Sequence, residues 1–117
     1  MNVKKFYEEI NGNYEGAIAL MMNDAFIARM VLKFYSKNSY NDIIASYENK
    51  DFETLFAAVH SFKGVAGNLS FTSLFDIASI ITEKTRNVSD VDISEEIGLL
   101  KTRYQAFLDA YHNYIEK

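Results

Sequence analysis

The sequence contains no cysteine, no proline and no tryptophan. Without cysteine there is no disulfide, no thiolate nucleophile and no thiolate metal site. Without proline, helices have to end at glycine, asparagine, serine or aspartate. No apolar run approaches the roughly 20 residues of a membrane span, and no signal peptide is expected. We therefore expect a cytoplasmic protein without a membrane segment.

Basic residues are few and dispersed. Twelve Lys and Arg against sixteen Asp and Glu give a formal net charge of −4, which argues against a nucleic-acid partner. Hydrophobic residues make up 49% of the 117 positions, enough for one core. We predict a single domain over residues 1–117, and we expect a monomer because no exposed heptad seam is present.

The apolar residues recur with a helical period and show no sustained strand alternation. A short helix is expected near residues 3–10, ending at the turn signal of residues 11–13, followed by one or two helical turns over 17–22. Longer helices are expected over 23–48 with a break at 37–39, over 51–69, from 72 to about 86, and over 93–115. Asn23 and Asp51 stand where N-cap residues belong. This pattern predicts an all-α fold: an antiparallel four-helix bundle with a short N-terminal covering helix.

The helix expected over 51–69 has two different faces. One stripe is apolar and should face the core: Leu55, Val59, Phe62, Ala66 and Leu69. The opposite stripe carries a histidine, a lysine and two glycines: His60, Lys63, Gly64 and Gly67. Glycine within a helix costs about 1 kcal/mol relative to alanine, so two of them suggest that a partner approaches the imidazole closely.

These residues favour phosphoryl chemistry. An imidazole in solvent titrates near neutrality, so a neutral ring nitrogen of His60 is available as a nucleophile. Lys63, one turn on, would place an ammonium beside a phosphoryl group on that nitrogen. Phe56 and Ala57 border His60 and could form an apolar docking patch, although Phe56 could equally belong to the core. Gly67 could instead permit a close helix crossing.

The segment from His60 resembles the signature of histidine-containing phosphotransfer (HPt) domains, which reads His-x-x-Lys-Gly, then small residues, then Leu-Gly. Here it runs His60-Ser61-Phe62-Lys63-Gly64-Val65-Ala66-Gly67-Asn68-Leu69. Residues 23–34 and 74–78 are similar to neighbouring helices of the family. The chain departs from the pattern at Ser70, where the family has glycine, and at Thr82, where it often has glutamate.

The resemblance implies a phosphocarrier in a two-component phosphorelay, with no autonomous kinase activity. His60 would be the phosphoacceptor, through Nε2, while Lys63 would stabilise the phosphoryl charge and Gly64 would give clearance. The partner would be the receiver domain of a response regulator, whose aspartate exchanges the group with His60, and in some systems a hybrid histidine kinase. The Mg²⁺ would belong to the receiver, and the chain would need no cofactor of its own.

Two other functions stay open. A helical module of the same fold could bind a receiver or kinase through Phe56, Ala57 and Gly67 without transferring phosphate. A metal-dependent enzyme on a helical bundle has less support, because no Glu-x-x-His pair is present and His60 and His112 lie far apart in the sequence.

Overall fold

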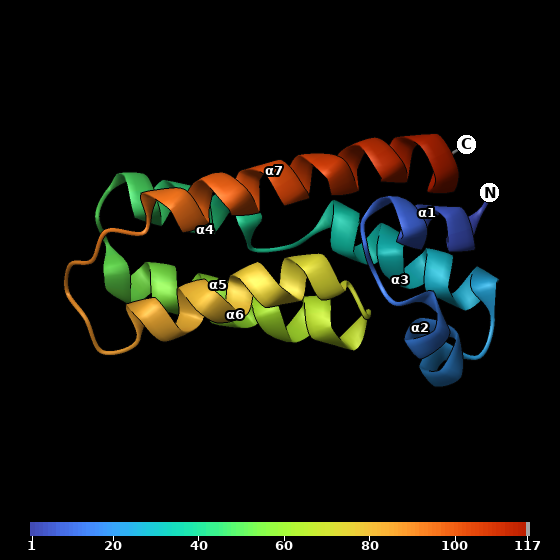
Figure 1. Ribbon diagram of the computed structural model, residues 1–117, viewed down its shortest axis with the longest axis horizontal. Helices are drawn as coiled ribbons and strands as arrows, with labels where there is room; N and C mark the ends of the chain where they lie inside the picture. Colours follow the sequence, from blue (N-terminus) through green and yellow to red (C-terminus); the bar gives the residue numbers. More distant parts are fainter. Residues whose placement is uncertain (117) are drawn as a thin grey trace.

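The computed structural model describes residues 1–116, which form an elongated bundle with both chain ends at one end (Figure 1). These residues contain helices and no strand, so the prediction of an all-α fold is confirmed. There are seven α-helices and a final π-helical turn: α1 (Val3–Glu9), α2 (Tyr14–Met21), α3 (Asp24–Ser36), α4 (Tyr40–Glu48), α5 (Phe52–Asn68), α6 (Thr72–Thr85), α7 (Ser94–Ala110) and η1 (Tyr111–Ile115).

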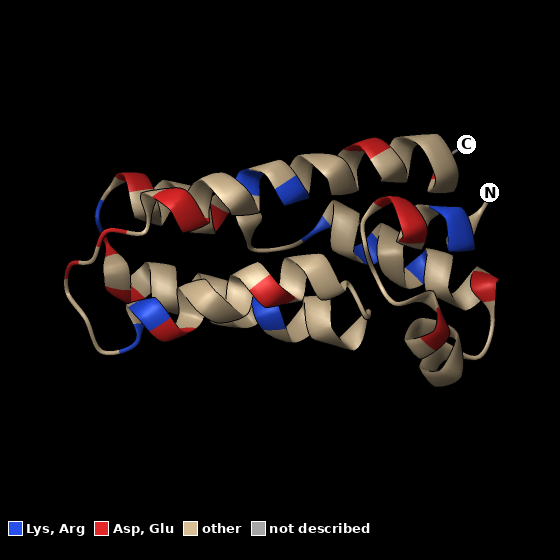
Figure 2. Ribbon diagram, in the orientation of Figure 1, with Lys and Arg blue, Asp and Glu red and all other residues tan. Residues whose placement is uncertain are grey.

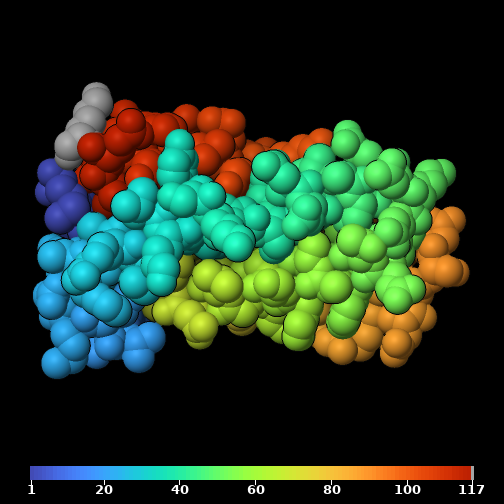
Figure 3. Space-filling view, turned by 180° about the vertical axis from the view of Figure 1, so that it is seen from behind, coloured from blue at the N-terminus to red at the C-terminus, as the bar shows by residue number. Residues whose placement is uncertain are grey.

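The long direction of the bundle is spanned four times. Helices α3 and α4 follow one another along it, and α5, α6 and α7 then run alternately in opposite directions, as the colours of Figure 1 show. Helix α5 packs against both α4 and α6, and α6 packs against α7. The same arrangement leaves α5 at the molecular surface beside α4 in the view from behind (Figure 3).

The break between α3 and α4 falls at the predicted residues 37–39, and Asn38 explains it. Its side-chain amide donates to the Phe34 carbonyl (2.7 Å), while its side-chain oxygen accepts from the Tyr40 backbone N–H (2.8 Å). Asn38 thus completes the end of one helix and leads into the next. Ser39 ties this corner to α5 by donating its hydroxyl to the Ala58 carbonyl (2.8 Å).

Asparagine and aspartate start the helices where proline is absent. Four N-cap side chains accept the backbone N–H three residues on: Asn2, Asn13, Asn23 and Asp51. The predicted caps Asn23 and Asp51 are confirmed. The left-handed positions that follow helices are held by other residues than glycine: Asn11, Met22, Lys50, Ser70 and Asn87. No glycine has a positive φ, so the helical glycines need an explanation other than turning the chain.

Phenylalanines from four helices and one turn fill the core at the end of the bundle that holds the chain termini. The Phe34 ring lies 5.2 Å from Phe107, 5.3 Å from Phe71 and 5.5 Å from Phe62. Phe6 of α1 joins this cluster 5.9 Å from Phe71, so α1 is the predicted covering helix. Helix α2 lies at the same end and begins earlier than the one or two turns expected over residues 17–22 (Figure 1).

Charge is mixed over the surface. Figure 2 shows acidic and basic segments interspersed over the described residues, without a continuous basic stripe. None of the helices described for residues 1–116 has the length and hydropathy needed to cross a bilayer.

Candidate functional site

Helix α5 presents the predicted site residues on its outer face. Its first turn is fixed by Asp51, which accepts from the Thr54 backbone N–H (3.2 Å) and hydroxyl (2.6 Å). The residues predicted to face the core are all buried: Leu55, Val59, Phe62, Ala66 and Leu69. His60 and Ala57 are exposed on the other side of the helix. The two-faced helix that the sequence predicted is therefore present.

The imidazole of His60 has an aromatic neighbour. The half-buried Phe56 ring lies nearly parallel to it, with 5.7 Å between the ring centres and 10° between the planes. The Phe56 ring also carries the guanidinium of Arg86, whose Cζ lies 5.1 Å from the ring centre. Phe56 is thus not a fully buried core residue, and part of its ring remains accessible beside His60. Its ring lies beside the His60 imidazole and also contacts the Arg86 guanidinium from the end of α6.

Lys63 is half-buried and leans across the groove between α5 and α6. Its Nζ lies 5.9 Å from the ring centre of Phe75, a distance at which a cation is attracted to the ring face. In this rotamer the ammonium faces the Phe75 ring of α6, and its placement beside a phosphoryl group on His60 stays a prediction. The flexible lysine stem can bring it to a group on His60 by changing rotamer.

The two glycines of this face have different surroundings. A Cβ added to Gly64 would meet nothing within 4 Å. A Cβ added to Gly67 would lie 3.0 Å and 3.1 Å from two ring carbons of Phe75. A side chain at position 67 would therefore press on Phe75 of α6, whereas no neighbour in the structure explains Gly64. A shallow cleft of about 510 Å³ runs beside Gly64, Gly67 and Phe75.

Past Gly67 the helix ends in a tight, fully hydrogen-bonded turn. The Phe71 N–H reaches the Ala66 carbonyl (2.9 Å) and the Ser70 N–H reaches the Gly67 carbonyl (3.1 Å), the pair of bonds that defines a Schellman motif. Ser70 has φ 59°, a conformation that favours glycine. Ser70 thus takes the left-handed position of the motif, and the backbone strain falls on serine.

A comparison with known protein families identifies the family of the chain. The family model of the Hpt domain matches residues 22–110, about three quarters of the chain. The chain belongs to the Hpt domain family. Hpt domains are histidine phosphotransfer modules that work with receiver domains and kinases in phosphorelays.

The part that matches the Hpt domain runs from just before α3 to the end of α7 and includes every candidate site residue. Helices α1 and α2 precede it. No curated protein and no solved structure gives a match to the chain.

Three residues of α6 and its end reach the site of this Hpt domain, and sequence reasoning missed all of them: Phe75, Glu83 and Arg86. Glu83 and Arg86 form an ion pair next to Phe56. The Arg86 side chain lowers the pKa of Glu83, with smaller contributions from Lys63 and His60. The sequence offered one signal for these residues: positions 75, 79, 83 and 86 have helical spacing and fall on one face of α6. Which face of α6 meets α5, however, is decided by how the two helices pack.

The other histidine has a different environment. His112 Nδ1 bonds to Glu116 four residues on, and the ring lies edge-on to Tyr35 and Tyr111. It has no glycine or lysine one turn ahead. Among residues 1–116, no group of three or more His, Asp or Glu is arranged to hold a metal ion.

Proposed function

We propose that this domain carries a phosphoryl group on His60 and exchanges it with the aspartate of a receiver domain. The observation that carries the proposal is the exposed imidazole on the open side of α5, next to a helical glycine that no internal packing explains. That combination leaves room for another protein to bring a phosphorylated side chain in line with the ring.

The transfer is a direct displacement at phosphorus. The lone pair of the neutral His60 Nε2 forms the new N–P bond while the bond from phosphorus to the receiver's aspartate oxygen breaks. The carboxylate leaves with the electron pair, and the ring gains a positive charge while Nδ1 keeps its proton. The reverse displacement returns the group to an aspartate. Charge stabilisation by cations near the phosphoryl oxygens is the main help that the protein can give.

The surrounding residues have separate roles in this proposal. Lys63 binds the phosphoryl oxygens, and Gly64 admits the receiver's loop. Phe56 and Ala57 supply the apolar edge of the docking surface, with Gly67 at its far side. Mg²⁺ is expected on the receiver domain, and we propose a monomeric, cytoplasmic carrier without a cofactor of its own.

The direct test is incubation of the protein with a phosphorylated receiver domain and Mg²⁺. We expect a label that is stable to alkali and labile to acid, as phosphohistidine is, and that is lost in His60→Gln. The matched control is His112→Gln, which should label like the wild type. A label that persists in His60→Gln, or vanishes in His112→Gln, would refute the assignment. Normal receiver binding without any label on the wild type would instead identify a non-transferring interaction module.

A further inference from the structure

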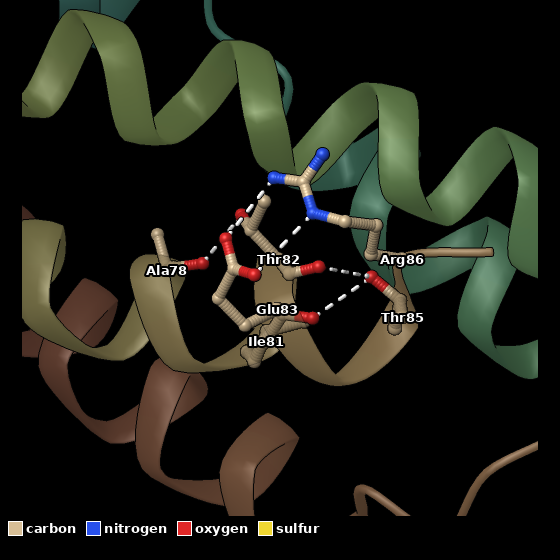
Figure 4. Close-up of polar contacts among 6 residues, drawn as sticks. All are labelled: Ala78, Ile81, Thr82, Glu83, Thr85 and Arg86. Carbon is tan, nitrogen blue, oxygen red and sulfur yellow. Dashed lines mark hydrogen bonds and ion pairs between the residues drawn. The ribbon is translucent and has the colours of Figure 1, made fainter. Parts of the chain in front are cut away.

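A bidentate ion pair closes the end of α6 beside the proposed phosphoacceptor. Arg86 donates from Nη2 to Glu83 Oε1 (3.0 Å) and from Nε to Oε2 (3.3 Å). Arg86 is the C-cap of α6, where the backbone has left the helix, so its side chain folds back across the last turn (Figure 4). The pair is open to solvent, with 45% of the Arg86 side chain and 64% of the Glu83 side chain exposed.

The pair is linked to His60 through one ring. The Arg86 guanidinium lies on Phe56, 5.1 Å from its centre, and Phe56 is stacked against the imidazole at 5.7 Å. Figure 4 shows the guanidinium reaching from α6 toward the adjacent α5 ribbon. Arg86 Nη1 makes no hydrogen bond to another described residue, so donors remain available on the guanidinium.

The carboxylate of Glu83 faces the same site. Besides Arg86, its nearest positive influences are Lys63 and His60, which both favour its charged form. A negative charge that is compatible with a neutral or cationic imidazole becomes unfavourable once that ring carries a phosphoryl group of charge near −2. The same group attracts a guanidinium, which binds phosphate oxygens in bidentate fashion.

We propose that phosphorylation of His60 opens the Glu83–Arg86 pair, so that Arg86 binds the phosphoryl group and Glu83 limits how long that group stays. The proposal rests on the proposed function of His60. An exposed ion pair is weak enough for a dianion to compete for the arginine. Glu83 would thus keep Arg86 away from an empty His60 and would oppose a phosphoryl group that is already bound.

The test is the lifetime of phosphohistidine after removal of the receiver, measured by loss of label in the whole protein. Glu83→Gln removes the repulsion and frees Arg86, so we expect a lifetime about two- to fivefold longer than in the wild type. Arg86→Gln removes the attraction and should shorten the lifetime by a similar factor. The matched control is Glu9→Gln, which breaks the exposed Lys5–Glu9 pair on α1 and changes the net charge equally.

A second measurement uses the wild-type protein and is independent of any variant. The Nε–H resonance of Arg86 should shift when His60 is phosphorylated, because its acceptor changes from a carboxylate to a phosphoryl oxygen. Equal lifetimes in Glu83→Gln and Glu9→Gln, or an unmoved Arg86 resonance, would overturn the inference. If the wild type takes up no label at His60, the proposed function itself fails, which is a different result.

Discussion

Two stretches of the same helix, less than two turns apart, meet opposite requirements. His60 and Gly64 form the open stretch on the outer face of α5: the imidazole is exposed, and a Cβ added to Gly64 would meet nothing within 4 Å. The end of the helix at residues 67–70 is the closed stretch, constrained by its neighbours: a Cβ on Gly67 would press on the Phe75 ring, Leu69 is buried, and Ser70 forms the turn into α6. The comparison shows that one residue type has two uses: Gly64 leaves space for a partner, whereas Gly67 allows α6 to pack closely.

The closed stretch also anchors the helix to the rest of the bundle. The buried hydroxyl of Tyr7 on α1 donates to the Leu69 carbonyl (2.7 Å), and the Asn13 N–H donates to the Ser70 carbonyl (2.9 Å). The first bond satisfies a carbonyl that the helix end leaves unpaired, and the second holds the turn that follows it. Helix α5 is thus fixed at its C-terminal end, while its middle stays accessible to a partner.

Filling the open stretch should have the largest effect. Gly64→Leu puts a bulky side chain one turn from His60, where it would hold a receiver away from the ring. We expect the rate of transfer from a phosphorylated receiver to fall about 100-fold, since a misplacement of the reacting groups by about 1 Å has that effect. The melting temperature should stay close to that of the wild type. The control is Gly98→Leu on α7, an equally unobstructed helical glycine. Equal transfer rates in the two variants would contradict the role of Gly64.

Loosening the closed stretch should lower stability and leave the chemistry intact. Tyr7→Phe leaves the buried Leu69 carbonyl without its donor, and we expect the free energy of unfolding in urea to fall by about 1–3 kcal/mol. The control is Tyr14→Phe, because the Tyr14 hydroxyl bonds to Asp24 (2.6 Å) at an exposed site and should contribute less. A loss in Tyr14→Phe as large as that in Tyr7→Phe would count against the anchor.

Substituting each glycine by alanine compares the two stretches directly. Gly64→Ala should raise the free energy of unfolding by about 0.5–1 kcal/mol, because alanine favours the helix and meets no neighbour. Gly67→Ala should gain less or lose stability, because Phe75 has to move by a few tenths of an ångström. The measurement is urea unfolding of both variants. The same gain at both positions would show that Phe75 does not constrain Gly67.

The smallest effect is expected at Ser70. The left-handed backbone conformation costs about 1–2 kcal/mol for a residue with a side chain. Glycine avoids this cost, but it loses more conformational entropy on folding, so only part of the cost is regained. Ser70→Gly should therefore raise the free energy of unfolding by about 0.5 kcal/mol. Ser61→Gly, in the middle of α5, should lower it by a similar amount. A loss of stability in Ser70→Gly would mean that the serine side chain stabilises this turn.

Much of the local structure could be predicted from the sequence because it depends on residues a few positions apart. The caps Asn23 and Asp51 and the break at 37–39 were placed correctly, since a cap bonds to the backbone within three residues. The apolar spacing identified which face of α5 is buried. The family match over residues 22–110 confirms the resemblance that the His60 segment suggested.

The surroundings of His60 could not be predicted in the same way. The contact of Arg86 with Phe56 joins residues 30 positions apart, and that of Phe75 with Gly67 depends on how α6 lies against α5. Helix spacing gives the face on which a residue lies, but the offset between two helices follows from the packing of all their side chains.

The sequence by itself determined that this chain is helical, which side of α5 faces the core, and that a histidine stands on the other side. These features follow from periodicity and capping, which are local. Only the tertiary structure decided that Gly67 is a packing residue while Gly64 is open, and that a glutamate–arginine pair from α6 lies beside the histidine. Those features require two helices to be placed against each other, and that placement is a property of the assembled core.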